Sequence, residues 1–326
     1  MAETLTFHFE GALADDHRMN FYESARFQYA AARLMVKLAQ FRKTGRFVKK
    51  ITNSSNFNIQ LISQAEGSFN INVEEPDQGD GEEEFVKISL ADLMAYVSER
   101  LIEKIDEAKL ANIATTNFPG ALGGEAGADF AAALDEIVEA AMADRAFIAS
   151  LPTQVQDLVR RRVAEVYRER RLAESQGAIA RIDFARSQKL IAMSAPLISE
   201  MATALRRSAD TLEVTSSIDG QTRSVLFLDR GMAQEIETAI VDEEITPILG
   251  DIAQFNKDNG WGKIKIENGQ KTLSFSIPYD ILPRIKQNLI DSMKKDLVYI
   301  QSYFVRDRSG EVIRLIVAGI LPTPTL

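Results

Sequence analysis

The sequence predicts an α+β protein, and three local patterns support this prediction. Apolar and polar residues alternate with a period of two near both ends of the 326-residue chain, which predicts strands. Apolar residues spaced three and four apart in the middle predict long helices. Tight hairpin turns are predicted where residues that tolerate positive φ separate two strand patterns, at Asp219-Gly220, Asn259-Gly260 and Asn268-Gly269.

We expect four consecutive segments along the chain. Residues 1–111 form an N-terminal α+β module in the order strand, helix, strand, strand, helix. Residues 112–128 form a Gly-rich linker, residues 129–209 a helical bundle or arm, and residues 210–326 a C-terminal β-rich module. A chain of this length is long enough for two or three domains.

The first segment begins with a strand in which Leu5, Phe7 and Phe9 alternate with polar residues. A helix is predicted over residues 19–43, and residues 57–73 predict a hairpin. Ser89 and Asp92 have the spacing of a capping box for the next helix. We expect the first helix to be largely buried, because Leu34, Leu38 and Phe41 extend an apolar stripe formed by Tyr22, Ala25, Tyr29, Ala32, Val36 and Ala39.

The predicted linker carries Pro119 and several glycines. Gly123-Gly124 is not followed by the Lys and Ser or Thr of a phosphate-binding loop, so a flexible connection is favoured over a nucleotide site. An acidic run over residues 74–84 lacks the ligand spacing of an EF-hand, which favours a solvated loop over a metal site.

The helical middle shows two patterns that bear on partners. A thin apolar stripe predicts self-association, because it is too apolar to face water; it consists of Val155, Val159, Val163 and Val166. Arginines surround this stripe, Arg160 and Arg161 among them. They are interpreted either as a solvated helix face or as a nucleic-acid contact, and the first is favoured.

The last segment has the most consistent local signals. Strand patterns over residues 248–255, 261–266 and 272–277 precede a helix over residues 281–293 and two further strands over 297–305 and 311–321. This order is OB-like and predicts a small antiparallel barrel, with an open antiparallel sheet and one covering helix as the alternative. A strand-strand-helix unit over residues 212–240 is expected to lie against this module.

One strand of the predicted barrel could bind nucleic acid. Trp261 could stack on a base while Lys263 and Lys265 contact phosphates. Tyr299 and Tyr303 would extend the platform if they face the same way. The alternative, which we favour, is that Trp261 fills the end of the barrel and the lysines are solvated.

Composition excludes several kinds of chemistry. The chain has no cysteine, which excludes disulfides, thiol catalysis and Cys-ligated zinc and is consistent with a reducing cytoplasm. His8 and His17 are its two histidines, and no nucleophile-elbow, dinucleotide, kinase or zincin motif accompanies them. We therefore expect no cofactor. No apolar run approaches the roughly 20 residues that span a bilayer, so no membrane partner is expected.

The stretch LTFHFEGALADDHRMNFYESARFQYAAARL, residues 5–34, resembles the start of uncharacterised bacterial proteins. Some of those proteins accompany mobile-element or phage-defence genes. The resemblance covers about a tenth of the chain and carries no motif of known chemistry. It implies a bacterial protein that acts as a defence accessory.

Three hypotheses of function follow. The first is a non-enzymatic interaction or scaffold protein that forms a homo-oligomer or binds another protein. The second is a nucleic-acid-binding protein that uses the OB-like module. The third is a hydrolase or nuclease with a carboxylate-bound metal, whose ligands would converge only in three dimensions. The net charge of −9 argues against indiscriminate binding to nucleic acid.

We expect limited proteolysis of the native chain to cut first within residues 112–128, because exposed Gly-rich segments are the preferred sites of cleavage. Mass spectrometry of the first fragments checks this. Early cleavage within residues 19–43, with residues 112–128 protected, would refute the predicted boundary.

Overall fold

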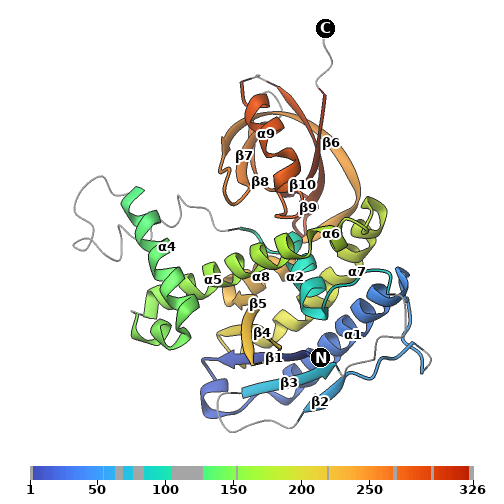
Figure 1. The fold of residues 1–326 in the computed structure, drawn as a ribbon, viewed down its shortest axis with the longest axis vertical. Coiled ribbons are helices and arrows are strands. Elements are labelled where there is room, and N and C mark those ends of the chain that lie inside the picture. Colours follow the sequence, from blue (N-terminus) through green and yellow to red (C-terminus); the bar gives the residue numbers. More distant parts are fainter. Residues whose placement is uncertain are drawn as a thin grey trace. The chain divides into compact units, whose positions relative to one another are not determined.

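Figure 1 shows the computed structural model of the chain. The structure describes residues 3–53, 55–62, 69–75, 84–104, 128–151, 153–218, 220–266, 270–294 and 297–322. It divides into two compact units: the larger comprises residues 1–103 and 168–326, and the smaller comprises residues 104–167. The predicted α+β class is confirmed.

The larger unit contains a five-stranded sheet in the order β2-β3-β1-β4-β5. Its strands are β1 (Glu3–Glu10), β2 (Gln60–Ile62), β3 (Phe69–Glu75), β4 (Thr211–Ile218) and β5 (Gln221–Asp229). All neighbouring strands are antiparallel, and β1 lies at the centre, where Phe7 faces Ile71 on one side and Val214 on the other.

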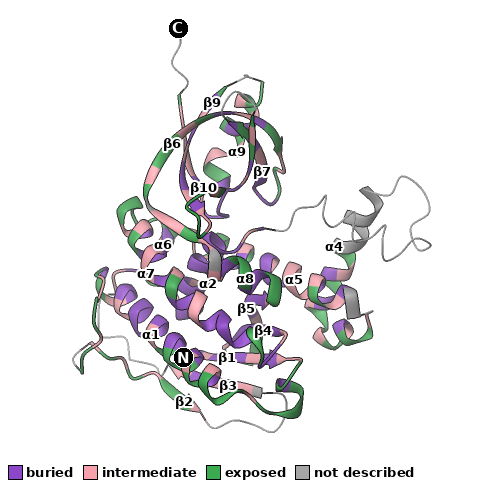
Figure 2. Cartoon of the chain, turned by 180° about the vertical axis from the view of Figure 1, so that it is seen from behind, coloured by how far each residue is buried: buried purple, intermediate pink, exposed green. Residues whose placement is uncertain are grey.

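Helices cover one face of this sheet. Alternate residues of β1 are buried, as the period of two predicts. Phe7 and Phe9 each meet the ring of Phe27 edge to face, at 5.4 and 4.8 Å between ring centroids. Figure 2 shows buried residues concentrated where these helices face the sheet. The helices of this unit include α1 (Phe21–Thr44), α2 (Leu90–Leu101), α6 (Gln176–Ile179), α7 (Phe184–Ala202) and α8 (Arg230–Thr238), with the 3-10 turns η1 (Ala14–Asp16) and η3 (Thr203–Arg206).

The ends of α1 follow local capping chemistry. The Asn20 side chain accepts hydrogen bonds from the backbone N–H groups of Tyr22 and Glu23 at the amino end. Gly45 ends the helix with a φ of 65°, which favours glycine. A Cβ at Gly45 would also lie 2.8 Å from the ring of Phe85, so this position is sterically restricted as well.

The predicted burial of α1 is confirmed for its second half and wrong for the first half of the stripe. Tyr22, Ala25, Tyr29 and Ala32 are exposed, although Val36 and Ala39 are buried. Phe27 is the buried side chain of the first turns instead, and Leu34, Leu38 and Phe41 are buried as expected. The helix is apolar on more than one face, and the side with the bulkier hydrocarbon groups removes more apolar area from water.

The amino end of α2 has both the predicted cap and an unpredicted one. Ser89 and Asp92 form the reciprocal capping box that their spacing predicts. In addition, Glu3 of β1 accepts from the N–H groups of Leu90 and Ala91 at 3.1 and 3.3 Å. This carboxylate therefore caps a helix whose first residue lies 87 positions later in the chain, and no local sequence pattern predicts that contact.

The prediction that the strand-strand-helix unit over residues 212–240 lies beside the terminal module is wrong for its strands. β4 pairs along its whole length with β1, so β4 and β5 complete the N-terminal sheet. The predicted 210–326 segment therefore contributes to two structures. Local patterns identify a hairpin but not the strand beside which it lies, because register between distant strands depends on tertiary packing.

The rest of this segment forms a closed five-stranded barrel in the order β10-β8-β7-β6-β9 (Figure 1). Its elements are β6 (Ile240–Phe255), β7 (Trp261–Ile266), β8 (Lys271–Ser276), α9 (Leu282–Ser292), β9 (Val298–Arg306) and β10 (Val312–Leu321). The predicted OB-like order is confirmed, and the ring is closed rather than open. One pair, β8 with β10, is parallel, because five strands cannot alternate in direction all around a closed ring.

The turn between β6 and β7 differs from the two-residue turn predicted at Asn259-Gly260. Five residues connect the strands, and among the described residues around this turn only Gly260 has positive φ, at 75°. The Asn259 side chain accepts from the N–H of Trp261 at 2.8 Å instead. The predicted hairpin at Asp219-Gly220 is confirmed, because Gly220 has a φ of 78° and Ile218 pairs with Gln221. Asp219 itself and the predicted turn at Asn268-Gly269 lie outside the described residues.

The smaller unit contains α4 (Ala128–Ala143), η2 (Arg145–Ser150) and the first part of α5 (Thr153–Glu174). Its core is a cluster of buried apolar side chains, formed by Val138, Ala141, Ile148, Val155, Val159 and Val163. Val166 packs against this cluster and is partly buried. The valine stripe predicted to need a second subunit is therefore covered within the chain by α4 and η2. The linker predicted over residues 112–128 lies outside the described residues, apart from its last position.

The helical middle does not form one bundle. α4, η2 and most of α5 belong to the smaller unit, whereas α6 and α7 belong to the larger one, where α7 packs against α1. The predicted 129–209 segment is thus divided within α5. In the described part of the chain, no helix combines the length and apolar character needed to cross a bilayer.

The carboxyl end of α2 joins the barrel through buried polar contacts. Arg100 donates to Asp280 in the β8–α9 connection at 2.6 Å between Nη2 and Oδ2. Glu99 accepts from the backbone N–H of Tyr279 at 3.3 Å. Arg314 of β10 donates to the backbone carbonyl of the last residue of α2. These contacts fix the barrel to the helices of the same unit.

Replacing Asp280 by Ala should lower the free energy of unfolding by about 3–5 kcal/mol, because it leaves the buried Arg100 guanidinium without its carboxylate. The double variant Arg100→Met, Asp280→Leu should lose far less, since it removes both charges. Urea unfolding of the three proteins measures this. A double variant at least as unstable as Asp280→Ala would contradict it.

Candidate nucleic-acid interface

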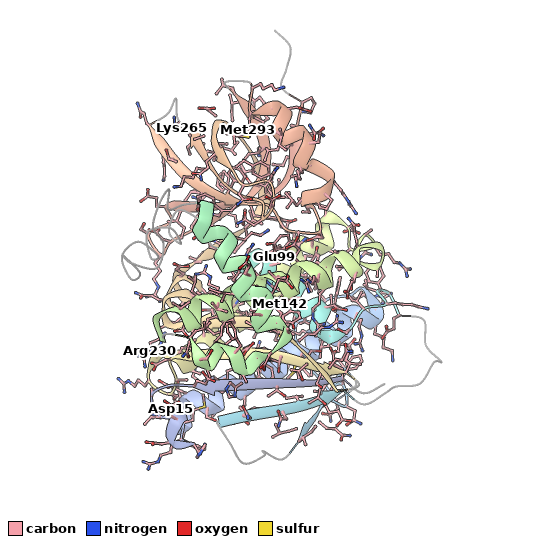
Figure 3. The ribbon with its side chains drawn as sticks, turned by 60° about the vertical axis from the view of Figure 1, so that its left-hand side comes forward. Asp15, Glu99, Met142, Arg230, Lys265 and Met293 are labelled. Atoms are coloured by element: carbon pink, nitrogen blue, oxygen red, sulfur yellow. The ribbon has the colours of Figure 1, made fainter. Side chains whose placement is uncertain are left out.

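The residues predicted to bind nucleic acid on the barrel do not form an exposed platform. Trp261 is only 3% exposed, although Lys265 on the same side of β7 points to solvent on the barrel's outer surface (Figure 3). Lys263 lies between them, with its Nζ 5.2 Å from the centroid of the Trp261 ring. The indole therefore presents no open face to a base.

The two tyrosines do not extend this strand. They lie on β9, and β6 separates β9 from β7 in the barrel order. Tyr303 is 3% exposed and stacks on Phe184 of α7, whereas Tyr299 is half-buried. The structure thus brings Trp261, Lys263 and Lys265 together and leaves Tyr299 and Tyr303 apart from them.

The arginines of α5 do not form one solvated face. Arg160 and Arg161 are half-exposed. Arg168 and Arg171 are buried, and they pair with carboxylates of α2 at 3.4 and 2.9 Å. Arg162 pairs with Glu165 at 3.0 Å. Some arginines of α5 therefore form internal ion pairs. The two interpretations of the sequence are a solvated helix face and a nucleic-acid contact, and neither includes such pairs.

His8 lies in β1 and is held by two polar side chains. Its two ring nitrogens lie 2.5 Å from the side-chain oxygen of Asn70 and 2.8 Å from a carboxylate oxygen of Glu10. The hydrogen bond to Glu10 raises the pKa of His8. His17 follows η1 in a left-handed conformation, with a φ of 55°.

A different surface combines exposed rings with cations, and it lies on α1. Phe21, Tyr22 and Tyr29 are 89%, 66% and 62% exposed. One turn after each tyrosine an arginine lies over its ring, Arg26 at 5.6 Å and Arg33 at 5.2 Å from the centroid. This arrangement follows from helix geometry, because residues four apart share a face.

Beside this face the chain after α1 folds back and encloses two adjoining hollows. The first has a volume of about 430 Å³ and lies between Tyr29 and Arg33 of α1 and the segment around Lys50. The second, of about 520 Å³, continues toward Lys189 of α7. Both are lined by Lys37 and Lys49. We call this combined feature the basic groove, and its cations are Arg33, Lys37, Lys49, Lys50 and Lys189.

Within the described residues, the cations of the basic groove lack acidic partners. The Lys37 ammonium donates to the carbonyl of Val48 at 2.6 Å and to that of Lys49 at 3.4 Å, not to a carboxylate. Burial and then the charge of Arg33 lower the pKa of Lys37. Among the described residues that line the two hollows, Glu244 carries the one carboxylate.

This arrangement favours binding of an extended anion. Cations held close together repel one another, and an anionic ligand would relieve that repulsion. Arg26, one turn before Tyr29 on α1, shows the contrast, since Glu200 pairs with it at 3.1 Å. The sequence contains a signal that would have located the surface, namely a tyrosine followed four residues later by an arginine, repeated after seven residues.

Metal-ligating side chains do not gather in the part of the chain that the structure describes. No group of three histidine, aspartate or glutamate residues that could hold a metal ion is found there.

No protein-family model, curated protein or solved structure matches this chain. The case for function accordingly depends on the geometry of its own residues. Within that geometry, the basic groove is the surface with the largest excess of cations over carboxylates among the hollows described.

Replacing Trp261 by Ala should destabilise the protein by about 3–5 kcal/mol, because a buried ring is removed and a cavity is left behind. Its affinity for oligonucleotides, measured well below the unfolding transition, should not change. Urea unfolding and fluorescence anisotropy provide the two measurements. Normal stability together with weakened oligonucleotide binding would return Trp261 to the role of a stacking residue.

Proposed function

We propose that this chain is a non-enzymatic protein that binds single-stranded nucleic acid along α1 and the basic groove. The observation that supports this proposal is the set of groove cations that, among the described residues, have no carboxylate partners and lie beside the exposed ring of Tyr29. Positive grooves with aromatic side chains are the common design of proteins that bind single strands without sequence preference.

The surface along α1 is long enough to meet several phosphates. From Tyr22 to Lys37 the helix advances about 22 Å, at roughly 1.5 Å per residue. Phosphates of one strand follow one another at about 3.4 Å along a duplex and farther apart when the strand is extended. The surface can therefore meet several phosphates at once, and each phosphate that it neutralises releases bound counterions.

The exposed rings favour a single strand over a duplex. Tyr22 and Tyr29 lie on the same face of α1 and are separated by about 10 Å along its axis. Unpaired bases can stack on such rings, whereas bases of a duplex are covered on both faces. The arginines over the two rings hold them against the helix surface and add positive charge.

The OB-like barrel is a weaker candidate for the same function. On β7 the predicted stacking residue Trp261 is buried, so this strand offers the charges of Lys263 and Lys265 without an exposed ring. Self-association also has less support than the valine pattern alone suggests, because the valine cluster of the smaller unit is already covered. It stays a prediction, as does the defence role that the N-terminal resemblance implies.

The triple variant Lys49→Gln, Lys50→Gln, Lys189→Gln should bind a single-stranded oligonucleotide more weakly. These lysines are exposed, so their replacement should not affect folding. The slope of log affinity against log salt should decrease by about 0.7 for each phosphate that is no longer neutralised, or roughly 2 in all. Fluorescence anisotropy in a series of salt concentrations measures this.

A matched variant, Lys263→Gln, Lys265→Gln, changes charge on the barrel and should leave both affinity and slope nearly unchanged. The variant Tyr22→Ala, Tyr29→Ala should weaken binding to single strands about tenfold per stacked base and affect duplex binding little. If only the barrel variant binds more weakly, the interface lies on the barrel. If the wild type binds no oligonucleotide at low salt, the proposed function is wrong.

A further inference from the structure

A second cavity lies in the larger unit between the helices and the barrel. It has a volume of about 220 Å³. α2 contributes Tyr96 and Arg100 to its walls, α7 contributes Ser187, and the barrel contributes Asp280 and Tyr303. None of these residues belongs to the basic groove, so the cavity is a separate feature.

Two polar atoms in the walls of this cavity are buried without a hydrogen-bond partner among the described residues. One is Oδ1 of Asp280, whose other oxygen accepts from Arg100. The other is the hydroxyl of Tyr303. Buried polar atoms almost always have a partner, so two such atoms in the walls of one cavity indicate a site for a polar ligand or water.

The protonation of these groups defines what they can bind. Burial raises the pKa of Tyr303 to about 12, so its hydroxyl keeps its proton and can donate. Ser187 has a minor influence on that pKa, but no hydrogen bond of ordinary geometry joins the two hydroxyls. The Ser187 oxygen instead accepts from Tyr96 at 2.7 Å. The cavity therefore presents a donor at Tyr303 and an acceptor at Asp280.

The remaining walls are apolar, with the cation of Arg284 at the opening. Isoleucines of α6, α9 and β10 line the cavity, Ile179, Ile285 and Ile316 among them. Arg284 and Phe184 are exposed lining residues, so the cavity opens to solvent beside them. At about 220 Å³ it is smaller than the roughly 300–1,000 Å³ typical of drug-sized ligands, so only part of a larger ligand can enter.

The geometry points to a nucleotide site in which the base enters the cavity and the phosphate meets Arg284. A base is flat and largely apolar on its faces, which suits the isoleucine walls. Its edge carries a donor beside an acceptor, which suits Asp280 and Tyr303. The base can belong to a mononucleotide or to an unpaired position of a strand.

Other ligands of similar size fit less well. An organic cation would lie near Arg100 and Arg284, and Asp280 is the one carboxylate among the described lining residues that could balance them; it is already paired. A small inorganic anion would leave the apolar walls and the Asp280 acceptor unused. A nucleotide uses the donor, the acceptor, the apolar walls and the cation together.

Isothermal titration calorimetry of the full chain with AMP, GMP, CMP and UMP tests this site. At least one of them should bind, and Tyr303→Phe should weaken that binding about fivefold, as expected when one hydrogen bond is removed. The melting temperature of this variant should not fall, because the removed hydroxyl has no partner among the described residues. Arg284→Gln should weaken nucleotide binding but not binding of the matching nucleoside.

The triple lysine variant of the basic groove separates this inference from the proposed function. It should bind the mononucleotide as well as the wild type does. In the wild type, displacement of the mononucleotide by an oligonucleotide would assign the base to a strand, and lack of displacement would assign it to a soluble nucleotide. No heat with any of the four nucleotides at millimolar concentration, or unchanged affinity in both Tyr303→Phe and Arg284→Gln, would overturn the site.

Discussion

The buried ion pairs at the carboxyl end of α2 are the constraint on which the larger unit depends. Arg100 pairs with Asp280 of the barrel side, and Glu99 pairs with Arg168 of α5. Figure 3 shows Glu99 in the interior, away from the outer surface where Lys265 lies. Charges removed from water are costly unless they are paired, so each partner fixes the position of the other. This one helix end therefore sets how the barrel meets the helices.

Both proposed binding surfaces follow from how the helices pack in the larger unit. The basic groove forms because α1 packs with one face on the sheet and beside α7, which leaves its tyrosines exposed and brings Lys189 near Lys49. The nucleotide cavity forms because α2, α7 and the barrel meet without filling the space between them. The groove offers charge and stacking along a line, whereas the cavity offers hydrogen bonds in a confined space. The two features suit a backbone and a single base, respectively.

The C-terminal barrel shows how far local patterns reach. Alternation, turn residues and the helix stripe near its middle predict the strand order, because each depends on residues close together in the chain. The parallel pairing of β8 with β10 and the pairing of β4 with β1 depend on contacts between distant residues. Trp261 illustrates the limit for a site, since local alternation predicts its strand but its burial depends on neighbours from other segments.

The sequence by itself determined the fold class, the cap of α2 at Ser89 and the OB-like order of the barrel, because these follow from short-range geometry. Tertiary structure decided which face of α1 is buried and which cations have partners. Tyr29 and Phe27 are both apolar enough to belong to a core, and only the packing of Phe27 on β1 places Tyr29 in solvent. Likewise Arg168 and Arg33 have the same side chain, but a carboxylate lies beside the first and a lysine near the second.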